Sequence, residues 1–104
     1  MKITRWNEVE LGALSEDSVR QRYSTSLYQV HLREVPEPSR IGGSAPRRIL
    51  IGVQGRWVLE AAGRQAVGGP GDVVELSSGE FAFQCAGPVR YLAVYELPPE
   101  LVRN

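Results

Sequence analysis

The side chains best suited to proton transfer in this sequence are one histidine, His31, and four tyrosines. Histidine is the side chain whose ordinary pKa lets it exchange protons near neutral pH. With Tyr28, Tyr91 or Tyr95 as its partner, His31 could serve as base or acid in a proton-transfer reaction. Such chemistry needs a carboxylate that holds the histidine, and nothing in the spacing identifies one. The alternative is an ordinary histidine at the protein surface.

The single cysteine, Cys85, is the other side chain with reactive chemistry. No basic neighbour in the sequence would lower its pKa, so we interpret it as a small packed apolar side chain rather than a nucleophile. One cysteine forms no internal disulfide, which fits a reducing cytoplasm. The Gly-Gly-Pro-Gly stretch at 68–71 is followed by no Lys-Ser/Thr pair, so it predicts a turn and not a phosphate-binding loop.

Composition excludes several classes of partner. Twelve Lys and Arg balance twelve Asp and Glu, so the formal net charge is zero and no overall field attracts nucleic acid or an anionic membrane. No apolar run follows Lys2, and none approaches the roughly 18 residues of a membrane helix. We therefore expect neither a signal peptide nor a membrane span, and a cytoplasmic location. A length of 104 residues predicts one domain.

Short apolar runs separated by glycine and proline predict an all-β sandwich or barrel. The predicted strands are 26–33, 49–54, 56–61, 72–76, 81–85 and 89–97. Residues 15–25 lack an apolar stripe at helical spacing and are expected to form a loop. Prolines end the first strand at 35–39, and 41–46 is expected to be a flexible connection. Of residues 1–14, we expect Trp6 to anchor the segment over one end of the barrel.

The order and spacing of these runs resemble the cupin family, the small β-barrels of the RmlC-like jelly-roll class, over about residues 26–97. The second cupin motif, G-x5-P-x-G-x2-H-x3-N, starts at Gly71 and matches Gly79. Ser77 stands at the proline position, Ala82 at the histidine position and Ala86 at the asparagine position. The glycines of the scaffold are therefore present, and the metal-binding histidine is replaced.

The first cupin motif, G-x5-H-x-H-x3/4-E-x6-G, closes on Gly55. Counting back, its glutamate position falls on Arg48, and its two histidine positions fall within 41–44, which contains no histidine. All four metal ligands of the family are thus absent, and metal ions need such nitrogen, oxygen or sulfur donors. We expect a metal-free cupin without a cofactor.

The resemblance implies that Arg48 and Ala82 point into the barrel, and strand alternation then adds Gln84 and directs Cys85 outward. A buried guanidinium needs a partner, and its planar fork suits a carboxylate or phosphate. One interpretation is that Arg48 binds the anionic group of a small ligand, with Gln84 and His31 completing the contact. The other is that Arg48 lies in water at the barrel mouth or pairs with an internal acid. The acids considered are Glu60, Glu75, Glu80 and Glu96.

The same alternation predicts an apolar outer surface, made of Ile49, Ile51, Val53, Phe81 and Phe83. A strand that is apolar on both faces is usually covered on both. The N-terminal segment is one cover for this surface, and a second subunit is the more economical one. We therefore expect a homodimer of closed symmetry through these residues.

The sequence as a whole predicts a single cupin-like jelly-roll domain over 1–104. Its barrel core is expected at about 26–97, with an N-terminal extension over 1–25 and a C-terminal tail over 98–104. The favoured function is metal-free binding of a small polar or anionic ligand, in a sensor, carrier or accessory role. Two alternatives stay open. One is a metal-independent isomerase or epimerase acting on a sugar-like substrate, as in some members of the resembled family, and the other is a structural dimerising module with a closed pocket.

Overall fold

A computed structural model describes residues 1–35, 39–45 and 47–97, apart from the side chains of residues 39 and 45. The predicted tail at 98–104 lies outside the described residues, as do residues 36–38 within the predicted break between the first two strands. The described elements, in chain order, are β1 (Lys2–Arg5), α1 (Glu8–Leu11), α2 (Glu16–Arg22), β2 (Tyr28–Val35), β3 (Ser39–Ala45), β4 (Arg48–Gln54), β5 (Trp57–Ala61), β6 (Arg64–Gly68), β7 (Asp72–Leu76), β8 (Gly79–Cys85) and β9 (Val89–Glu96).

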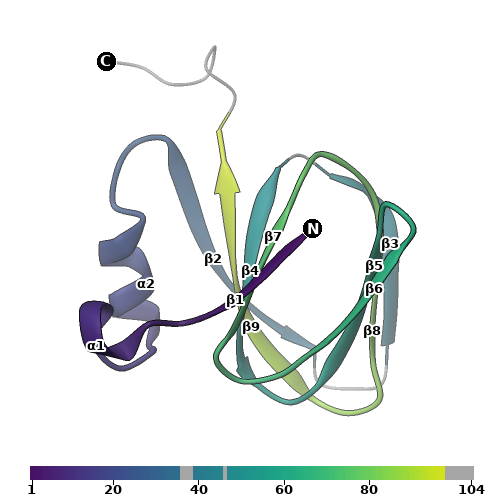
Figure 1. The fold of residues 1–104 in the computed structure, drawn as a ribbon, viewed down its shortest axis with the longest axis horizontal. Helices are drawn as coiled ribbons and strands as arrows, with labels where there is room; N and C mark the ends of the chain where they lie inside the picture. The colour runs from purple at the N-terminus through teal and green to yellow at the C-terminus, as the bar shows by residue number, and fades with distance from the viewer. Residues whose placement is uncertain (36–38, 46, 98–104) are drawn as a thin grey trace.

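The strands form two antiparallel sheets that face each other (Figure 1). The larger sheet has the order β1-β7-β4-β9-β2, and the smaller has the order β3-β8-β5-β6. Between them lies a core to which both sheets contribute, with Leu50 and Ala93 from the larger sheet and Leu59 and Phe83 from the smaller. The predicted all-β jelly-roll class is confirmed.

The tightest turn joins β5 and β6 through two residues with positive φ. Ala62 has φ 53° and Gly63 has φ 73°. Positive φ at both central residues is the signature of the hairpin turn that matches the twist of its strands. No strand was predicted between 61 and 72, but β6 pairs with β5 along its length, from Ala61↔Arg64 to Trp57↔Gly68.

Strand β3 forms where the sequence indicated a flexible connection. Its residues have weak strand propensity, since they include Gly42 and Gly43, but it pairs with β8 from Ser39↔Cys85 to Ala45↔Gly79. Pairing with a neighbouring strand outweighs intrinsic propensity here, as is common in sheets. β3 and β2 are edge strands of the two sheets.

Residues 1–25 form a strand and two short helices, and α2 lies where a loop was expected at 15–25. Ser15 caps α2, where its Oγ accepts a hydrogen bond from the Ser18 N–H at 3.0 Å while Ser18 Oγ accepts one from the Ser15 N–H at 2.8 Å. α2 buries a single side chain, Val19, which is why no helical stripe is visible in the sequence. Trp6 is buried, but on the outer face of the larger sheet instead of over one end of the barrel, and its Nε1 donates to the Gly12 carbonyl at 2.9 Å.

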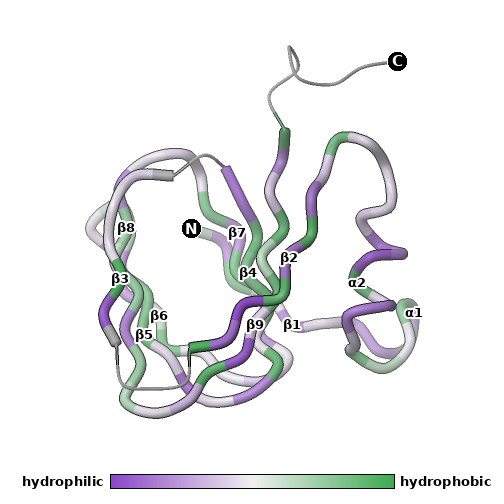
Figure 2. Tube along the Cα trace, turned by 180° about the vertical axis from the view of Figure 1, so that it is seen from behind, coloured by the Kyte–Doolittle hydropathy of each residue, from purple (hydrophilic) through white to green (hydrophobic). Residues whose placement is uncertain are grey.

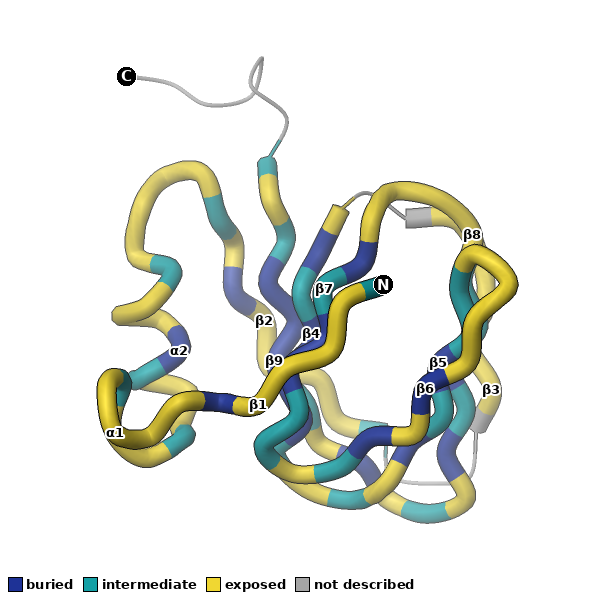
Figure 3. The backbone as a smooth tube through the Cα atoms, in the orientation of Figure 1, coloured by how far each residue is buried: buried dark blue, intermediate teal, exposed yellow. Residues whose placement is uncertain are grey.

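The two helices cover the outer face of the larger sheet. A second apolar cluster there joins Trp6 and Val19 to Ile51, Leu92 and Val94. In Figure 3, the buried part of α2 faces the buried strands of the larger sheet. Figure 2 shows hydrophobic and hydrophilic residues alternating along β2, the strand nearest the helices.

This arrangement corrects the predicted dimer surface. Ile51 is fully buried within one protomer, and Ile49 and Val53 are half-buried against the same cluster. Phe81 and Phe83 belong to the inner core instead of the outer face. The chain's own N-terminal segment therefore covers the surface that was assigned to a second subunit. None of the described helices is long and apolar enough to cross a membrane.

Candidate functional site

Strand β8 presents the opposite face to the one predicted. Phe83 and Cys85 are buried in the core between the sheets, Phe81 packs against it, and Ala82 and Gln84 point the other way. The predicted inward direction of Gln84 and outward direction of Cys85 are therefore wrong. The Phe-Ala-Phe pattern at 81–83 indicates which face of β8 points inward, because burying two phenylalanines gains more free energy than burying an alanine and an amide.

A cavity of about 380 Å³ lies between the two sheets. The larger sheet contributes Arg33, Glu34, Val35, Arg48, Leu50, Tyr91 and Tyr95, and the smaller sheet contributes Ile41, Phe81 and Phe83. Its volume lies within the roughly 300–1,000 Å³ typical of small-molecule sites. Of the residues predicted for a site, Arg48, Tyr91 and Tyr95 line this cavity. Arg33 was not among them, and Phe81 and Phe83 were expected on the outer surface.

Arg48 is the buried charged residue of this cavity, with 6% of its surface exposed. Its Cζ lies 3.8 Å from the centre of the Phe81 ring, so the guanidinium stacks on an aromatic face. Among the described residues, no hydrogen bond or ion pair to the guanidinium is present. Burial lowers the pKa of Arg48, and the nearby Tyr95 and Tyr91 partly oppose that effect. The group stays a cation under ordinary conditions because arginine ionises so strongly.

The acids considered as internal partners of Arg48 lie elsewhere. Glu75 pairs with Lys2 at 3.8 Å and Glu96 with Arg47 at 3.3 Å. Glu60 accepts a hydrogen bond from Gln65 at 3.3 Å, and Glu80 is exposed. None of these four carboxylates forms an ion pair with Arg48, so the pairings considered for it are not observed.

A second arginine adds to the positive charge of the cavity. Arg33 pairs with Tyr91 in the strand register, so both side chains lie on the inner face of the larger sheet. Glu34 also borders the cavity, but its carboxylate lies 2.9 Å from Arg90 Nη2, on the opposite face of the sheet. Within the described part of the chain, the cavity is therefore lined by the buried Arg48 and the exposed Arg33, without an opposing carboxylate side chain directed into it.

Aromatic rings from both sheets line the cavity. The Phe83 and Tyr91 rings lie 5.2 Å apart, and Trp57 stacks on the other side of Phe83 at 6.0 Å. Burial raises the pKa of Tyr91, which keeps its phenol protonated at neutral pH. Of these rings, Phe83 and Tyr91 line the cavity together with Arg48, and Trp57 packs behind them in the core.

His31 does not line the cavity but lies next to Tyr95, which does. His31 pairs with Ala93, an inner core residue, so its side chain is on the inner face of β2 and remains exposed. Its ring meets that of Tyr95 edge-on, with the centroids 5.6 Å apart. The structure thus brings together four of the five predicted site residues: His31, Arg48, Tyr91 and Tyr95. It excludes Gln84.

The side chains around the cavity do not fit a metal ion. Across residues 1–35, 39–45 and 47–97, no group of three or more His, Cys, Asp and Glu side chains is close enough to hold one. A guanidinium stands in the cavity where a cation site would need deprotonated donors. The positive charge in the cavity is therefore that of the Arg48 side chain.

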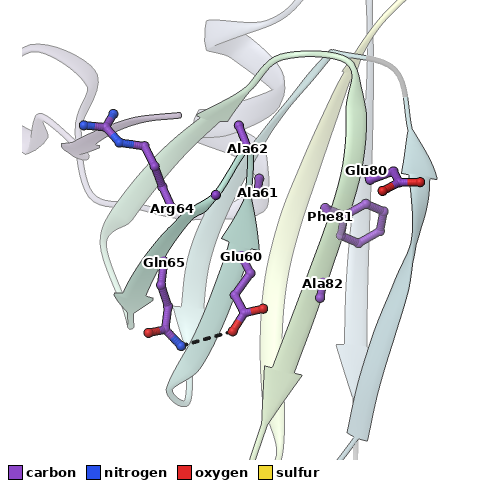
Figure 4. Close-up of a pocket in the computed structure, with 9 residues that line it drawn as sticks. Glu60, Ala61, Ala62, Arg64, Gln65, Glu80, Phe81 and Ala82 are labelled. Atoms are coloured by element: carbon purple, nitrogen blue, oxygen red, sulfur yellow. Dashed lines mark hydrogen bonds between the residues drawn. The ribbon is translucent and has the colours of Figure 1, made fainter.

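A second hollow, of about 460 Å³, lies outside the barrel beside the β5–β6 turn (Figure 4). Glu60 and Gln65 bind each other there, and the Arg64 side chain extends away from Glu80. Gln65, Arg64 and Glu80 are all exposed, so water satisfies them. This hollow offers no buried charge, and we assign the candidate site to the cavity between the sheets.

Solved structures share this fold. A cupin superfamily protein from Desulfitobacterium hafniense is similar at a TM-score of 0.63 and 14% identity, over 71% of this chain and 71% of that chain. A Cupin 2 conserved barrel domain protein from Salinispora arenicola has a TM-score of 0.62 and 22% identity, over 73% and 67%. A putative ethanolamine utilization protein Q from Salmonella typhimurium has a TM-score of 0.61 and 15% identity, over 73% and 62%.

These likenesses show the fold: the chain forms a cupin barrel, as its sequence pattern indicated. No protein-family model matches the sequence, and a search of curated proteins found no match. The chain spans 56% of a similar EutQ protein from Clostridium difficile and 62% of the putative ethanolamine utilization protein Q from Salmonella. What those proteins do is therefore not carried over with the fold.

Proposed function

We propose that the protein binds a small anionic ligand in the cavity between its two sheets, and acts without a metal as a sensor, carrier or accessory protein. The observation that carries this proposal is the guanidinium of Arg48, buried to 6% exposure and without a described carboxylate partner. Burying a charge without a partner is costly, so an anion that enters the cavity supplies the missing interaction. Arg33 at the rim adds to the attraction.

The cavity also argues against a closed structural module. Leu50, Phe83 and Trp57 fill the inner end of the barrel, but about 380 Å³ remains beside Arg48. That space is within the range of small-molecule sites. A ligand site explains both the open volume and the buried cation.

Thermal unfolding with a panel of anions and neutral analogues tests the proposal. A ligand that binds the folded state alone stabilises it by RT ln(1 + [L]/Kd), or about 2.7 kcal/mol at a hundredfold excess over Kd. We expect small anions to raise the melting temperature of the wild type and to have no effect on Arg48→Gln. Arg64→Gln is the matched control, because it removes one exposed positive charge. Equal shifts in both variants would contradict the proposal.

One observation favours an isomerase as a second candidate: the contact between the His31 and Tyr95 rings. A histidine and a tyrosine placed together can remove and return a proton at a substrate carbon. The test is deuterium uptake from heavy water by a panel of nucleotide sugars, followed by NMR with wild type and His31→Ala. Uptake that depends on His31 supports the enzyme, and uptake no faster than without protein excludes it for those sugars.

A further inference from the structure

The walls of the cavity indicate what the uncharged part of the ligand is, as well as the sign of its charge. Phe81 and Phe83 come from the smaller sheet, and Tyr91 and Tyr95 come from the larger one, so aromatic rings border the cavity from both sides. Aromatic side chains prefer offset-stacked or edge-to-face contacts with another ring, worth roughly 0.5–1.5 kcal/mol beyond the buried area. A flat ring gains these contacts, whereas a hydroxylated sugar would face mostly apolar walls.

The orientation of Arg48 defines the headgroup. One face of its guanidinium stacks on Phe81, with Cζ 3.8 Å from the ring centre. The N–H groups lie in the plane of the guanidinium, so this stacking leaves its edge available to a hydrogen-bond acceptor. A planar carboxylate matches that edge with two parallel hydrogen bonds.

A phosphate fits the same surroundings less well. Phosphate sites commonly surround several oxygens with backbone N–H groups at a helix N-terminus or in a nest. Here the described donors at the cavity are the guanidinium of Arg48, the phenols of Tyr91 and Tyr95, and the exposed Arg33, all on side chains and beside apolar walls. A single buried cation, Arg48, with a tyrosine phenol near it suits an acid that carries one negative charge.

We propose that the ligand is a small aromatic carboxylate, with its carboxylate on the edge of Arg48 and its ring among Phe81, Phe83, Tyr91 and Tyr95. This inference rests on the proposed function, because it assumes that an anion occupies the cavity. The volume of about 380 Å³ is at the lower end of the range for ligand sites, which favours a single ring system.

The test is calorimetric titration of the purified protein with four probes: benzoate, cyclohexanecarboxylate, phenylphosphonate and benzamide. We expect benzoate to bind about tenfold or more tightly than each of the others, a difference of about 1.4 kcal/mol or more. Arg48→Met is expected to lose benzoate binding, and Arg64→Met to keep it. Phe81→Leu is expected to reduce the ratio of benzoate to cyclohexanecarboxylate affinity, a readout that compares two ligands on the same folded variant.

The outcomes separate this inference from the proposed function. If cyclohexanecarboxylate binds as tightly as benzoate, the aromatic ligand is excluded and anion binding stands. If phenylphosphonate binds more tightly, the carboxylate headgroup is excluded and anion binding again stands. If benzamide equals benzoate, or if Arg48→Met binds as well as wild type, Arg48 does not receive an anion and both proposals fail. If none of the probes binds, the aromatic carboxylate is overturned, and the wider anion panel decides the proposed function alone.

Discussion

Arg48 and Phe81 face each other across the barrel, and the guanidinium carbon of the one lies 3.8 Å from the ring centre of the other. They belong to different sheets, β4 and β8, so this stacked pair spans the interior. A cation–π contact contributes roughly 0.5–2 kcal/mol, which is less than the cost of burying a charge that lacks a hydrogen-bonded anion. Within residues 1–35, 39–45 and 47–97, the site is therefore electrostatically incomplete.

This incompleteness predicts that removal of the charge stabilises the protein in the absence of ligand. Replacing buried ionic groups with well-packed apolar ones is often neutral or stabilising by about 1–4 kcal/mol. Arg48→Met keeps the unbranched stem and a sulfur that packs on aromatic rings. We expect its free energy of unfolding in urea to rise by about 1 kcal/mol or more, while ligand binding is lost.

Arg64→Met is the control for that measurement, because Arg64 is exposed and its replacement is expected to change stability by less than about 0.5 kcal/mol. A loss of stability in Arg48→Met would show that the guanidinium is satisfied in the folded protein. The interpretation of Arg48 as an anion receptor would then lose its physical basis.

Gly68 is predicted to be irreplaceable because of the Trp57 indole. A Cβ on Gly68 would collide with the six-membered ring of Trp57, which is 2% exposed and stacks on Phe83. Overpacking of this kind costs about 1–3 kcal/mol or more. Gly68→Ala is expected to lower the free energy of unfolding by that amount. Gly87→Ala is the matched variant, since its Cβ would meet open space, and an equal loss in both would rule out the packing explanation.

The helical cover of the larger sheet is predicted to depend on Val19. This side chain is fully buried, whereas Val9 of α1 is 97% exposed. Val19→Ala is expected to cost about 1–3 kcal/mol in urea unfolding, because it removes two methyl groups and leaves a cavity. The same substitution at Val9 is expected to change stability by less than about 0.5 kcal/mol. Similar effects at both positions would mean that α2 does not pack on the sheet in solution.

Two half-buried tyrosines predict a loss of stability in alkali. Burial raises the pKa of both Tyr23 and Tyr91. Between the ordinary tyrosine pKa of about 10 and these raised values, the folded protein retains protons that the unfolded chain has released. Stability is therefore fully present below pH about 10 and declines as the pH rises through that window. In urea unfolding across this pH range, the free energy of unfolding of the Tyr23→Phe/Tyr91→Phe double variant is expected to fall less steeply with pH than that of the wild type. Equal slopes would contradict the assignment of this pH dependence to the two tyrosines.

Much of the fold could be predicted from the sequence because apolar runs and glycine turns carry strand information directly. The strands around Leu50, Leu59, Val74 and Leu92 were all placed this way. β3 was missed because its glycines have no strand propensity and its pairing with β8 is a long-range contact. α2 was missed because a helix that buries only Val19 has no apolar stripe to detect.

The candidate site was predictable in part. Arg48 was located by a motif position and faces the interior as that position implies. The face of β8 was assigned by counting residues from Gly79, whereas its direction is set by the burial of Phe81 and Phe83. Arg33 was missed because only the register of β2 with β9, which pairs it with Tyr91, shows that it borders the cavity.

Native mass spectrometry of the wild type as purified, compared with Arg48→Met, tests the central claim most directly. Wild type is expected to carry a small acidic molecule that gentle denaturation releases and accurate mass identifies, and Arg48→Met is expected to carry none. The same spectrum reports the subunit count and therefore tests the predicted homodimer. Two results would contradict the assignment of Arg48 as the anion receptor. One is a wild type that carries no adduct even after incubation with the anions that were tested, and the other is an adduct that Arg48→Met retains.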